Sequence, residues 1–155
     1  MTPAGRFRGH QRCSRIDYSN PHHVFLVTVC VNPRRDVFVT QERNLRVLVE
    51  LEDAQRQGRM GVFAYCIMPD HIHLLVNPGD PGLPAAMRYF KGRLAAWWRR
   101  NGDGQTLWQD GYSDHRLRSD ESFEEKCAYI FANPVRRGLV RAASEYRWSG
   151  SLCAR

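Results

Sequence analysis

A hairpin around one Pro-Asp turn is the feature that most constrains how this chain can fold. Residues 62–68 and 71–76 form two short apolar runs, rich in Val, Ile and Leu, which is typical of buried strands. Pro69 and Asp70 separate the runs, and both residue types are favoured in tight turns. The pattern predicts two adjacent antiparallel strands.

The remaining apolar patterns predict strands and helices in alternation. Residues 24–31 (VFLVTVCV) indicate a central strand, and residues 40–58 a helix with Leu45, Leu48 and Val49 at helical spacing. A second helix is expected over 85–100, a strand over 112–118, and a last helix opening at 119–122 and ending before Pro134. This order favours an α+β fold, a ferredoxin-like antiparallel sheet with helices packed on it.

The length of 155 residues fits one core. Residues 1–20 carry several arginines without apolar periodicity and are expected to be a flexible basic arm. Residues 21–151 are then the single folded domain, and residues 152–155 are a short tail. We expect no signal peptide and no membrane-spanning segment, because no apolar stretch of about 18 residues is present.

The charge of the chain favours a polyanionic partner. The net charge is +7, and nearly all of the positive charge is arginine, since Lys91 and Lys126 are the only lysines. The arginine guanidinium matches phosphate oxygens and stacks on bases. The five cysteines show no CxxC spacing, which indicates reduced thiols and a cytoplasmic protein.

Two histidines in the second hairpin strand are candidate metal ligands. His71 and His73 are two residues apart on a strand, so both side chains project from the same face. Imidazoles bind divalent transition metals, but two of them do not fill a coordination sphere. A third oxygen or nitrogen donor must come from elsewhere, and a chance HxH pair in a half-exposed strand is the alternative.

A tyrosine in the last helix is a candidate nucleophile. Phe123, Cys127, Ile130 and Phe131 form one apolar stripe, and Tyr129 lies outside it. Asn133 lies one turn after Tyr129 on the same edge of the helix. A phenol attacks phosphodiesters effectively when a metal neutralises the phosphate charge, so the tyrosine and the histidine pair make chemical sense together.

Four segments in this order resemble the REP-associated tyrosine transposases, relatives of the single-tyrosine HUH transposases: MPDHIHLLV, LWQDGYSDHRLRS, YIFANPVRRGLV and YRWSGS. The resemblance spans residues 21–151 and implies an HUH-type fold. It also implies a metal-dependent enzyme that nicks and joins single-stranded DNA beside hairpins of repeated extragenic palindromes. His71 and His73 match the metal pair, Tyr129 matches the nucleophile that forms a 5′-phosphotyrosine, and Mg²⁺ or Mn²⁺ is the expected metal.

The third metal ligand stays open at the sequence level. Related insertion-sequence transposases carry a glutamine four residues after the tyrosine, whereas this chain has Asn133. His115 and Asp70 are the competing donors. The related enzymes act as dimers whose tyrosine reaches the partner's site, and the REP-associated branch tends toward monomers, so a monomer is expected and a dimer is the alternative.

Candidate DNA contacts lie on the basic arm, on the helix KGRLAAWWRR and after the tyrosine helix. They are Arg12, Arg15, Lys91, Arg93, Trp97, Arg99, Arg100, Arg136 and Arg137. A core role for the tryptophan and a solvated surface for the arginines are the alternatives on the helix. A non-catalytic hairpin or single-strand binding protein is the rival function. A two-histidine phosphoesterase is disfavoured because the chain lacks His-x-Ser and His-x-Thr elements.

Overall fold

Nine short elements follow one another in the computed structural model, which describes residues 15–153. They are β1 (Phe25–Cys30), α1 (Gln41–Arg56), β2 (Met60–Met68), β3 (His71–Pro78), α2 (Leu83–Asn101), β4 (Ser113–Arg116), α3 (Phe123–Arg136), the 3-10 turn η1 (Ala143–Glu145) and β5 (Ser149–Gly150). Helices α1 and α3 begin at side-chain caps: the hydroxyls of Thr40 and Ser122 accept hydrogen bonds from the third residue after each.

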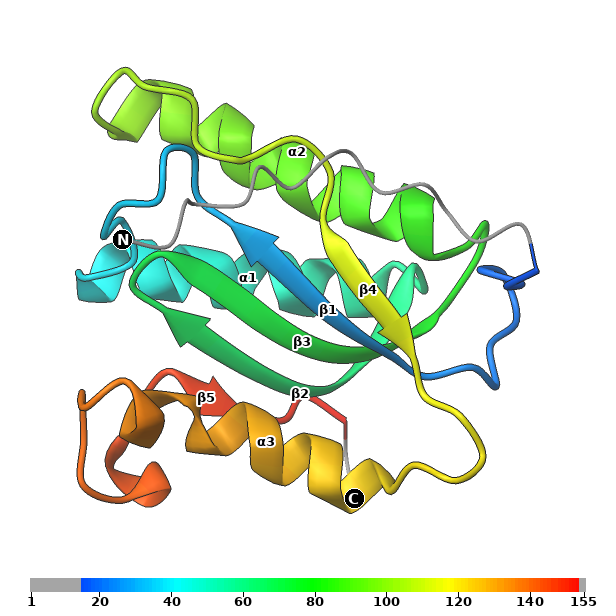
Figure 1. Cartoon of the computed structure of the whole chain (residues 1–155). Helices are drawn as coiled ribbons and strands as arrows, with labels where there is room; N and C mark the ends of the chain where they lie inside the picture. The colour runs from blue at the N-terminus through cyan, green and yellow to red at the C-terminus, as the bar shows by residue number, and fades with distance from the viewer. Residues whose placement is uncertain (1–14, 154–155) are drawn as a thin grey trace.

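The five strands form one antiparallel sheet in the order β4-β1-β3-β2-β5. The first four strands have the ferredoxin-like arrangement, in which β1 and β3 are central, so the predicted α+β fold is confirmed. The two-residue strand β5 extends the sheet beside β2, and no apolar pattern in the sequence predicts it. Figure 1 shows the sheet with α2 and α3 on either side of it.

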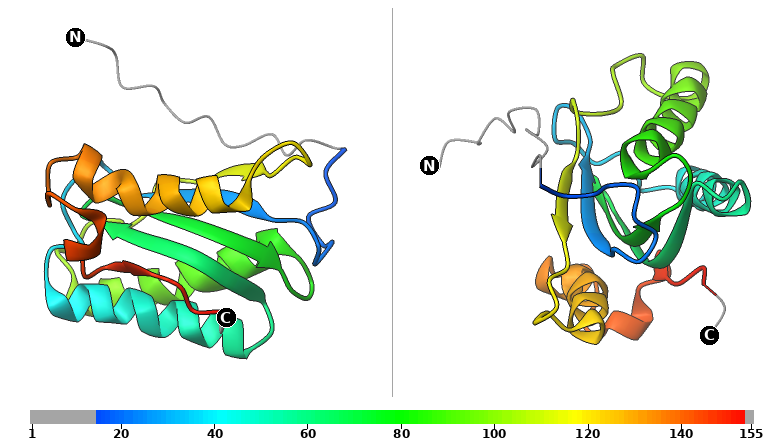
Figure 2. Two further views of the ribbon diagram at one scale, coloured as in Figure 1. Left: turned by 90° about the horizontal axis from the view of Figure 1, so that it is seen from below. Right: turned by 90° about the vertical axis from the view of Figure 1, so that its right-hand side faces the viewer.

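The sheet separates two layers of helices of unequal size. Helices α1 and α2 cover one face, where side chains such as Val27, Val29 and Leu74 form the main core. Helix α3 covers the other face over a smaller cluster, which contains Cys66, Leu75 and Ile130. Figure 2 (left) shows this order of helix, sheet and helices. Because strand residues alternate between faces, the even-numbered residues of β1 and the odd-numbered residues of β3 face α3.

The last helix was expected to end before Pro134, and this expectation is wrong. Helix α3 runs through Pro134 to Arg136. Proline has no backbone N–H, so the carbonyl of Ile130 loses its helical partner. The side-chain amide of Asn133 replaces it: Nδ2 donates to the carbonyl oxygens of Ile130 at 3.2 Å and of Tyr129 at 3.1 Å. A side chain one residue before the proline therefore lets the helix continue for one more turn.

The edges of the folded domain and the packing of α1 also differ from expectation. Ile16 and Tyr18 pack against the main core, so the packed chain begins before residue 21, and Leu152 extends it at the other end. Leu45 and Val49 are exposed, because α1 turns Val47, Leu51 and Ala54 toward the sheet. Between residues 15 and 153, no helix is both long and apolar enough to cross a membrane.

Candidate active site

The two histidines of β3 converge on the α3 face of the sheet. The Nε2 atoms of His71 and His73 lie 3.0 Å apart, and the rings are nearly perpendicular. Both residues are buried, at 6% and 8% exposure. Two buried imidazoles that direct the same nitrogen to one point are arranged as a candidate ligand pair.

The outer nitrogens of the two rings are held by neighbouring side chains. Nδ1 of His71 donates to Oδ1 of Asp70 at 2.6 Å, since an ionised carboxylate only accepts. This bond places the proton on Nδ1 and leaves the lone pair of Nε2 directed inward. Nδ1 of His73 lies 3.0 Å from Oγ1 of Thr28 on the adjacent strand. Such outer partners fix the orientation of metal-binding histidines.

Asp70 lies behind His71, so it does not reach the point where the two Nε2 atoms meet. Its second carboxylate oxygen accepts a hydrogen bond from Arg34 at 2.9 Å, and Arg137 lies 3.8 Å from the first. Burial opposes ionisation of Asp70, but the hydrogen bonds from His71 and Arg34 outweigh it, and its pKa is lowered. The structure therefore places Asp70 in contact with Nδ1 of His71, on the side of the ring away from the point where the two Nε2 atoms meet.

The donor set fits a six-coordinate divalent ion. Two nitrogens bound at about 2.1 Å and at right angles around one ion are about 3.0 Å apart, which matches the Nε2–Nε2 distance. Within the described residues, no group of three His, Cys, Asp or Glu side chains could hold a metal. A third protein ligand must therefore be another oxygen donor, such as an amide.

Asn133 on α3 supplies such an amide. It is buried, at 8% exposure, and its side chain lies within hydrogen-bonding reach of His73. Both hydrogens of its Nδ2 are directed to the helix carbonyls of Tyr129 and Ile130, so the amide oxygen is the atom left to act as a donor. The helix contacts that carry α3 past Pro134 thus also orient the candidate third ligand.

His115, the other competing donor, lies away from the pair. It is on β4, which is separated from β3 by β1, and its register partner on β1 is Leu26, two residues from the Thr28 that contacts His73. Its Nε2 lies 2.9 Å from both carboxylate oxygens of Glu121, and its side chain is half exposed. The structure brings Asn133 to the histidine pair and leaves His115 in an ion pair at the sheet edge.

Tyr129 projects beside the histidine pair from the outer surface of α3. Its ring centroid lies 6.1 Å from that of His73, and it is 44% exposed, whereas Phe123, Cys127, Ile130 and Phe131 pack into the cluster under α3. The guanidinium of Arg136 lies 4.3 Å from the centre of the tyrosine ring. This cation–π contact orients the ring and places a positive charge at its face.

Burial keeps the histidine pair neutral. The pKa of His73 is lowered to about 3, first by burial and then by the positive charges of His71, Arg136 and Arg34. Burial also lowers the pKa of His71, although Asp70 opposes the shift. Neutral imidazole is the form that binds metal, so the site is in its ligand form at neutral pH.

The predicted DNA contacts divide into three groups by position. Arg136 and Arg137 are exposed next to Tyr129, at the end of α3. The candidates on α2 lie in the opposite layer: Lys91 donates to the carbonyls of Gln109 and Gly111, Arg93 pairs with Glu50, Trp97 packs against the main core, and Arg99 and Arg100 are exposed. Arg15 is exposed, and Arg12 is outside the described residues.

Two residues of the site were missed from the sequence. Thr28 is the hydroxyl-bearing residue in the apolar run VFLVTVCV, which is a usable signal, because a polar side chain in a buried strand needs a partner. Arg34 had no such signal, since it reaches Asp70 from the loop after β1. Both act on the outer side of the histidine pair.

Comparisons with known proteins show the family of this chain. The family described as "Transposase IS200 like" matches residues 19–133. A REP-associated tyrosine transposase of Escherichia coli K12 is 25% identical over 121 residues, covering 76% of this chain and 69% of that protein. A Haemophilus influenzae relative, named for the same group, is 28% identical over 102 residues, and the alignment spans 56% of each chain.

One solved structure shares the fold over most of the chain. It is a REP-associated tyrosine transposase bound to a REP hairpin, with a TM-score of 0.71 and 21% identity, covering 88% of this chain and 81% of that one. At this identity, the likeness supports the arrangement of the sheet and helices. The resemblance found in the four sequence segments is confirmed by the family match and the named relatives.

Proposed function

Because this chain belongs to the IS200-like transposase family, we propose that it is a metal-dependent single-stranded DNA transesterase that acts through Tyr129. It nicks DNA beside a hairpin, forms a 5′-phosphotyrosine and then passes the strand to a new 3′ hydroxyl. The single observation that carries this proposal is that Tyr129 and Asn133 of α3 lie beside the convergent histidine pair of β3. His71 and His73 meet at Nε2, Asn133 is within reach of His73, and the Tyr129 ring lies 6.1 Å from His73.

The reaction conserves the number of phosphodiester bonds. The oxygen of Tyr129 attacks the scissile phosphorus and forms a Tyr–O–P bond, the P–O3′ bond breaks, and the departing oxygen takes up a proton to become a 3′ hydroxyl. A second 3′ hydroxyl then attacks the phosphotyrosine, and Tyr129 leaves. The proton lost by the phenol is matched by the proton gained on the leaving oxygen. Because each step exchanges one phosphodiester bond for another, no external energy source is needed.

His71, His73 and the amide oxygen of Asn133 would hold the divalent ion, of the Mg²⁺ or Mn²⁺ class. When bound, such an ion stabilises negative charge on the scissile phosphate and on the departing oxygen. The protein residues around it fix the ligands: Asp70 and Thr28 hold the outer nitrogens of the two rings. The cation–π contact with Arg136 orients the Tyr129 ring for attack.

Exposed arginines beside the site suit the DNA backbone. Arg136 and Arg137 follow Tyr129 on the same side of the molecule, and Arg34 lies 41% exposed at Asp70. Arginine binds phosphate oxygens in a bidentate manner, so these three positions are proposed to hold the phosphates that flank the scissile bond. The solved structure that shares the fold is bound to a REP hairpin, which supports hairpin DNA as the substrate class.

The proposal is tested by incubating the full chain with hairpin-bearing single-stranded DNA and Mn²⁺, followed by a denaturing gel. Wild-type protein is expected to form a denaturation-resistant protein–DNA adduct, and Tyr129→Phe is expected to form none. Removing either histidine by His71→Ala or His73→Ala, or chelating the metal, should abolish the adduct while hairpin binding persists.

Tyr89→Phe is the matched control, because Tyr89 is on α2 in the other layer and its hydroxyl donates to Asp53. This variant should form the adduct at the wild-type level. If the wild-type protein binds the hairpin but yields no adduct under any of these conditions, the rival reading of a non-catalytic binding protein replaces this one.

A further inference from the structure

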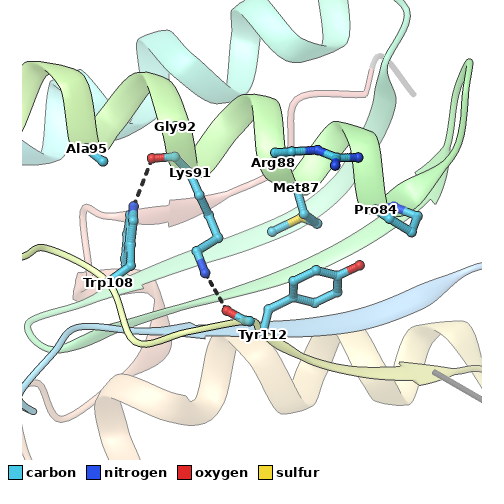
Figure 3. A pocket seen from close by; sticks show the side chains of 9 residues that line it. Pro84, Met87, Arg88, Lys91, Gly92, Ala95, Trp108 and Tyr112 are labelled. Carbon is cyan, nitrogen blue, oxygen red and sulfur yellow. Dashed lines mark hydrogen bonds between the residues drawn. The ribbon is translucent and has the colours of Figure 1, made fainter. Parts of the chain in front are cut away.

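A pocket of about 390 Å³ lies between α2 and the segment that leads into β4. Its helical wall consists of two adjacent rows of α2 residues, each at a spacing of four: Pro84, Arg88 and Gly92 in one row, and Met87, Lys91 and Ala95 in the other. The facing wall consists of Trp108, Gly111 and Tyr112. Figure 3 shows the Tyr112 ring facing α2 near Met87 and Arg88. The volume is within the usual range of about 300–1,000 Å³ for ligand sites.

The wall opposite α2 is fixed in place by hydrogen bonds. Nε1 of Trp108 donates to the carbonyl of Lys91 at 3.0 Å, and Nζ of Lys91 donates to the carbonyls of Gln109, at 3.1 Å, and Gly111. Burial lowers the pKa of Lys91. The pocket therefore has preformed sides and does not depend on a ligand to assemble it.

Gly92 lies on the helical wall of the pocket and faces open space. A glycine in the middle of a helix is unfavourable by about 1 kcal/mol relative to alanine, so it calls for a reason. Packing within the protein is not that reason, because a Cβ atom at Gly92 would meet no atom within 4 Å. The residue is exposed and lines the pocket. Any side chain at this position would extend into space that the protein itself leaves empty.

We propose that this pocket binds one unpaired nucleobase of the DNA substrate. The ring of Tyr112, half-buried at the wall of the pocket, offers an apolar face on which a flat aromatic ring can stack. Arg88 is exposed at the pocket and suits the phosphate of the same nucleotide. The ammonium group of Lys91 favours a base edge with acceptor oxygens, as guanine and thymine have.

The pocket is within reach of the strand that occupies the proposed active site. Ser113, the residue after Tyr112, pairs with Thr28, and Thr28 contacts His73. With strands spaced about 4.8 Å apart, β4 is about 10 Å from β3. A single strand that crosses the exposed edge β4 can therefore engage His73 on one face and place a neighbouring base in the pocket on the other. This inference rests on the proposed function for the identity of its ligand.

The pocket is tested without using catalysis, in the presence of a chelator. The probe is a DNA hairpin with short single-stranded flanks, in which one flanking base at a time is replaced by 5-iodouracil. After irradiation, the cross-linked peptide is identified by mass spectrometry. One flank position is expected to cross-link within residues 108–112, and loss of the base at that position, in an abasic probe, should weaken binding about 5- to 100-fold.

Two variants separate pocket filling from damage to the fold. Gly92→Ala should raise the melting temperature, because alanine favours the helix, and Gly92→Leu should fill the pocket, abolish the cross-link and weaken binding of the intact probe about 5- to 100-fold. Gly92→Leu should bind the abasic probe with the same affinity as the wild-type protein does. Arg88→Ala should weaken binding more than Arg56→Ala, a matched change at an exposed position of α1.

The outcomes distinguish this inference from the proposed function. If the adduct with Tyr129 forms but Gly92→Leu binds and cross-links like wild type, the base pocket is wrong and the transesterase stands. If the flanked hairpin does not bind the wild-type protein at all, both fall. Binding of free mononucleotides that is also lost in Gly92→Leu, without a cross-link from the flanks, would make the pocket a site for free nucleotides and overturn the assignment to the DNA strand.

Discussion

At the scale of single residues, the histidine pair depends on side chains that do not touch the point of convergence. Asp70 fixes the tautomer of His71, and Thr28 contacts the outer nitrogen of His73. Sequence alone placed the two histidines on one face of a strand, because alternation on a strand is a local property. It could not predict the contact of Asp70 with His71, since a carboxylate adjacent to a ligand can coordinate an ion or orient the ligand, and the direction of its side chain is not a local property of the sequence.

Replacing Asp70 by Asn is expected to weaken Mn²⁺ binding about 10- to 100-fold, the usual effect of losing an outer partner of a metal-binding histidine. The amide no longer enforces a proton on Nδ1 of His71, so Nε2 is less often the free lone pair. Titration calorimetry with Mn²⁺ measures the effect. Asp120→Asn, at an exposed position, serves as the control. Unchanged affinity in Asp70→Asn would show that Asp70 does not orient the ligand.

The low pKa of His73 makes the metal-free protein sensitive to acid. The imidazole titrates at about 3 in the folded chain and near 6.5 when unfolded, so between these values the unfolded state binds a proton that the folded state does not. The free energy of unfolding should therefore fall with decreasing pH, by about 1.4 kcal/mol per pH unit from this group. His73→Gln should reduce that slope in urea denaturation with a chelator, and His22→Gln, at an exposed site, should not.

At the scale of elements, most strands and helices followed from periodicity and caps. The hairpin, the central strand β1 and all three helices were predicted, because each has an apolar pattern of its own. Three features were not predictable in this way. The strand β5 has two residues and no pattern, α1 buries Glu50 between Arg46 and Arg93, and α3 continues past Pro134. Each is decided by a partner distant in sequence or by a side-chain contact that compensates for the proline.

Helix α3 offers a test of that compensation. Asn133→Ala should lower the free energy of unfolding by about 1–3 kcal/mol, because the buried carbonyl of Ile130 loses its donor. Pro134→Ala restores a backbone N–H that can reach the same carbonyl. Asn133→Ala should therefore lower the free energy of unfolding less in the Pro134→Ala background than in the wild-type protein. Chemical denaturation of the two single variants and the double variant measures this difference. Additive effects of the two substitutions would mean that the amide does not replace the missing helical bond.

At the scale of the whole molecule, the proposed nucleophile and ligands belong to one chain. Tyr129 lies beside His73 of its own sheet, and we propose that the chain acts in cis as a monomer. This arrangement could not be read from the sequence, because it depends on how α3 packs across β2 and β3.

A mixture of Tyr129→Phe with His71→Ala is expected to form no DNA adduct, because neither variant has a complete site. Each variant is also mixed with wild type as a control, and the adduct is measured on a denaturing gel. Recovery of adduct in the mixture of the two variants would show that the tyrosine of one chain serves the histidines of another. Light scattering of the wild-type protein should give the mass of one chain.

The unequal layers of the fold have a consequence for how such a protein is inactivated. The side chains that would perform the reaction are divided between the sheet and α3, and α3 rests on the smaller of the two apolar clusters. Local opening begins where the least apolar surface is buried. On heating, the helix that carries Tyr129 and Asn133 should detach before the sheet and its other helices melt. The highest temperature at which the protein is active is then set by how stably α3 packs on the sheet. A thermal melt that follows the whole fold would overestimate that temperature.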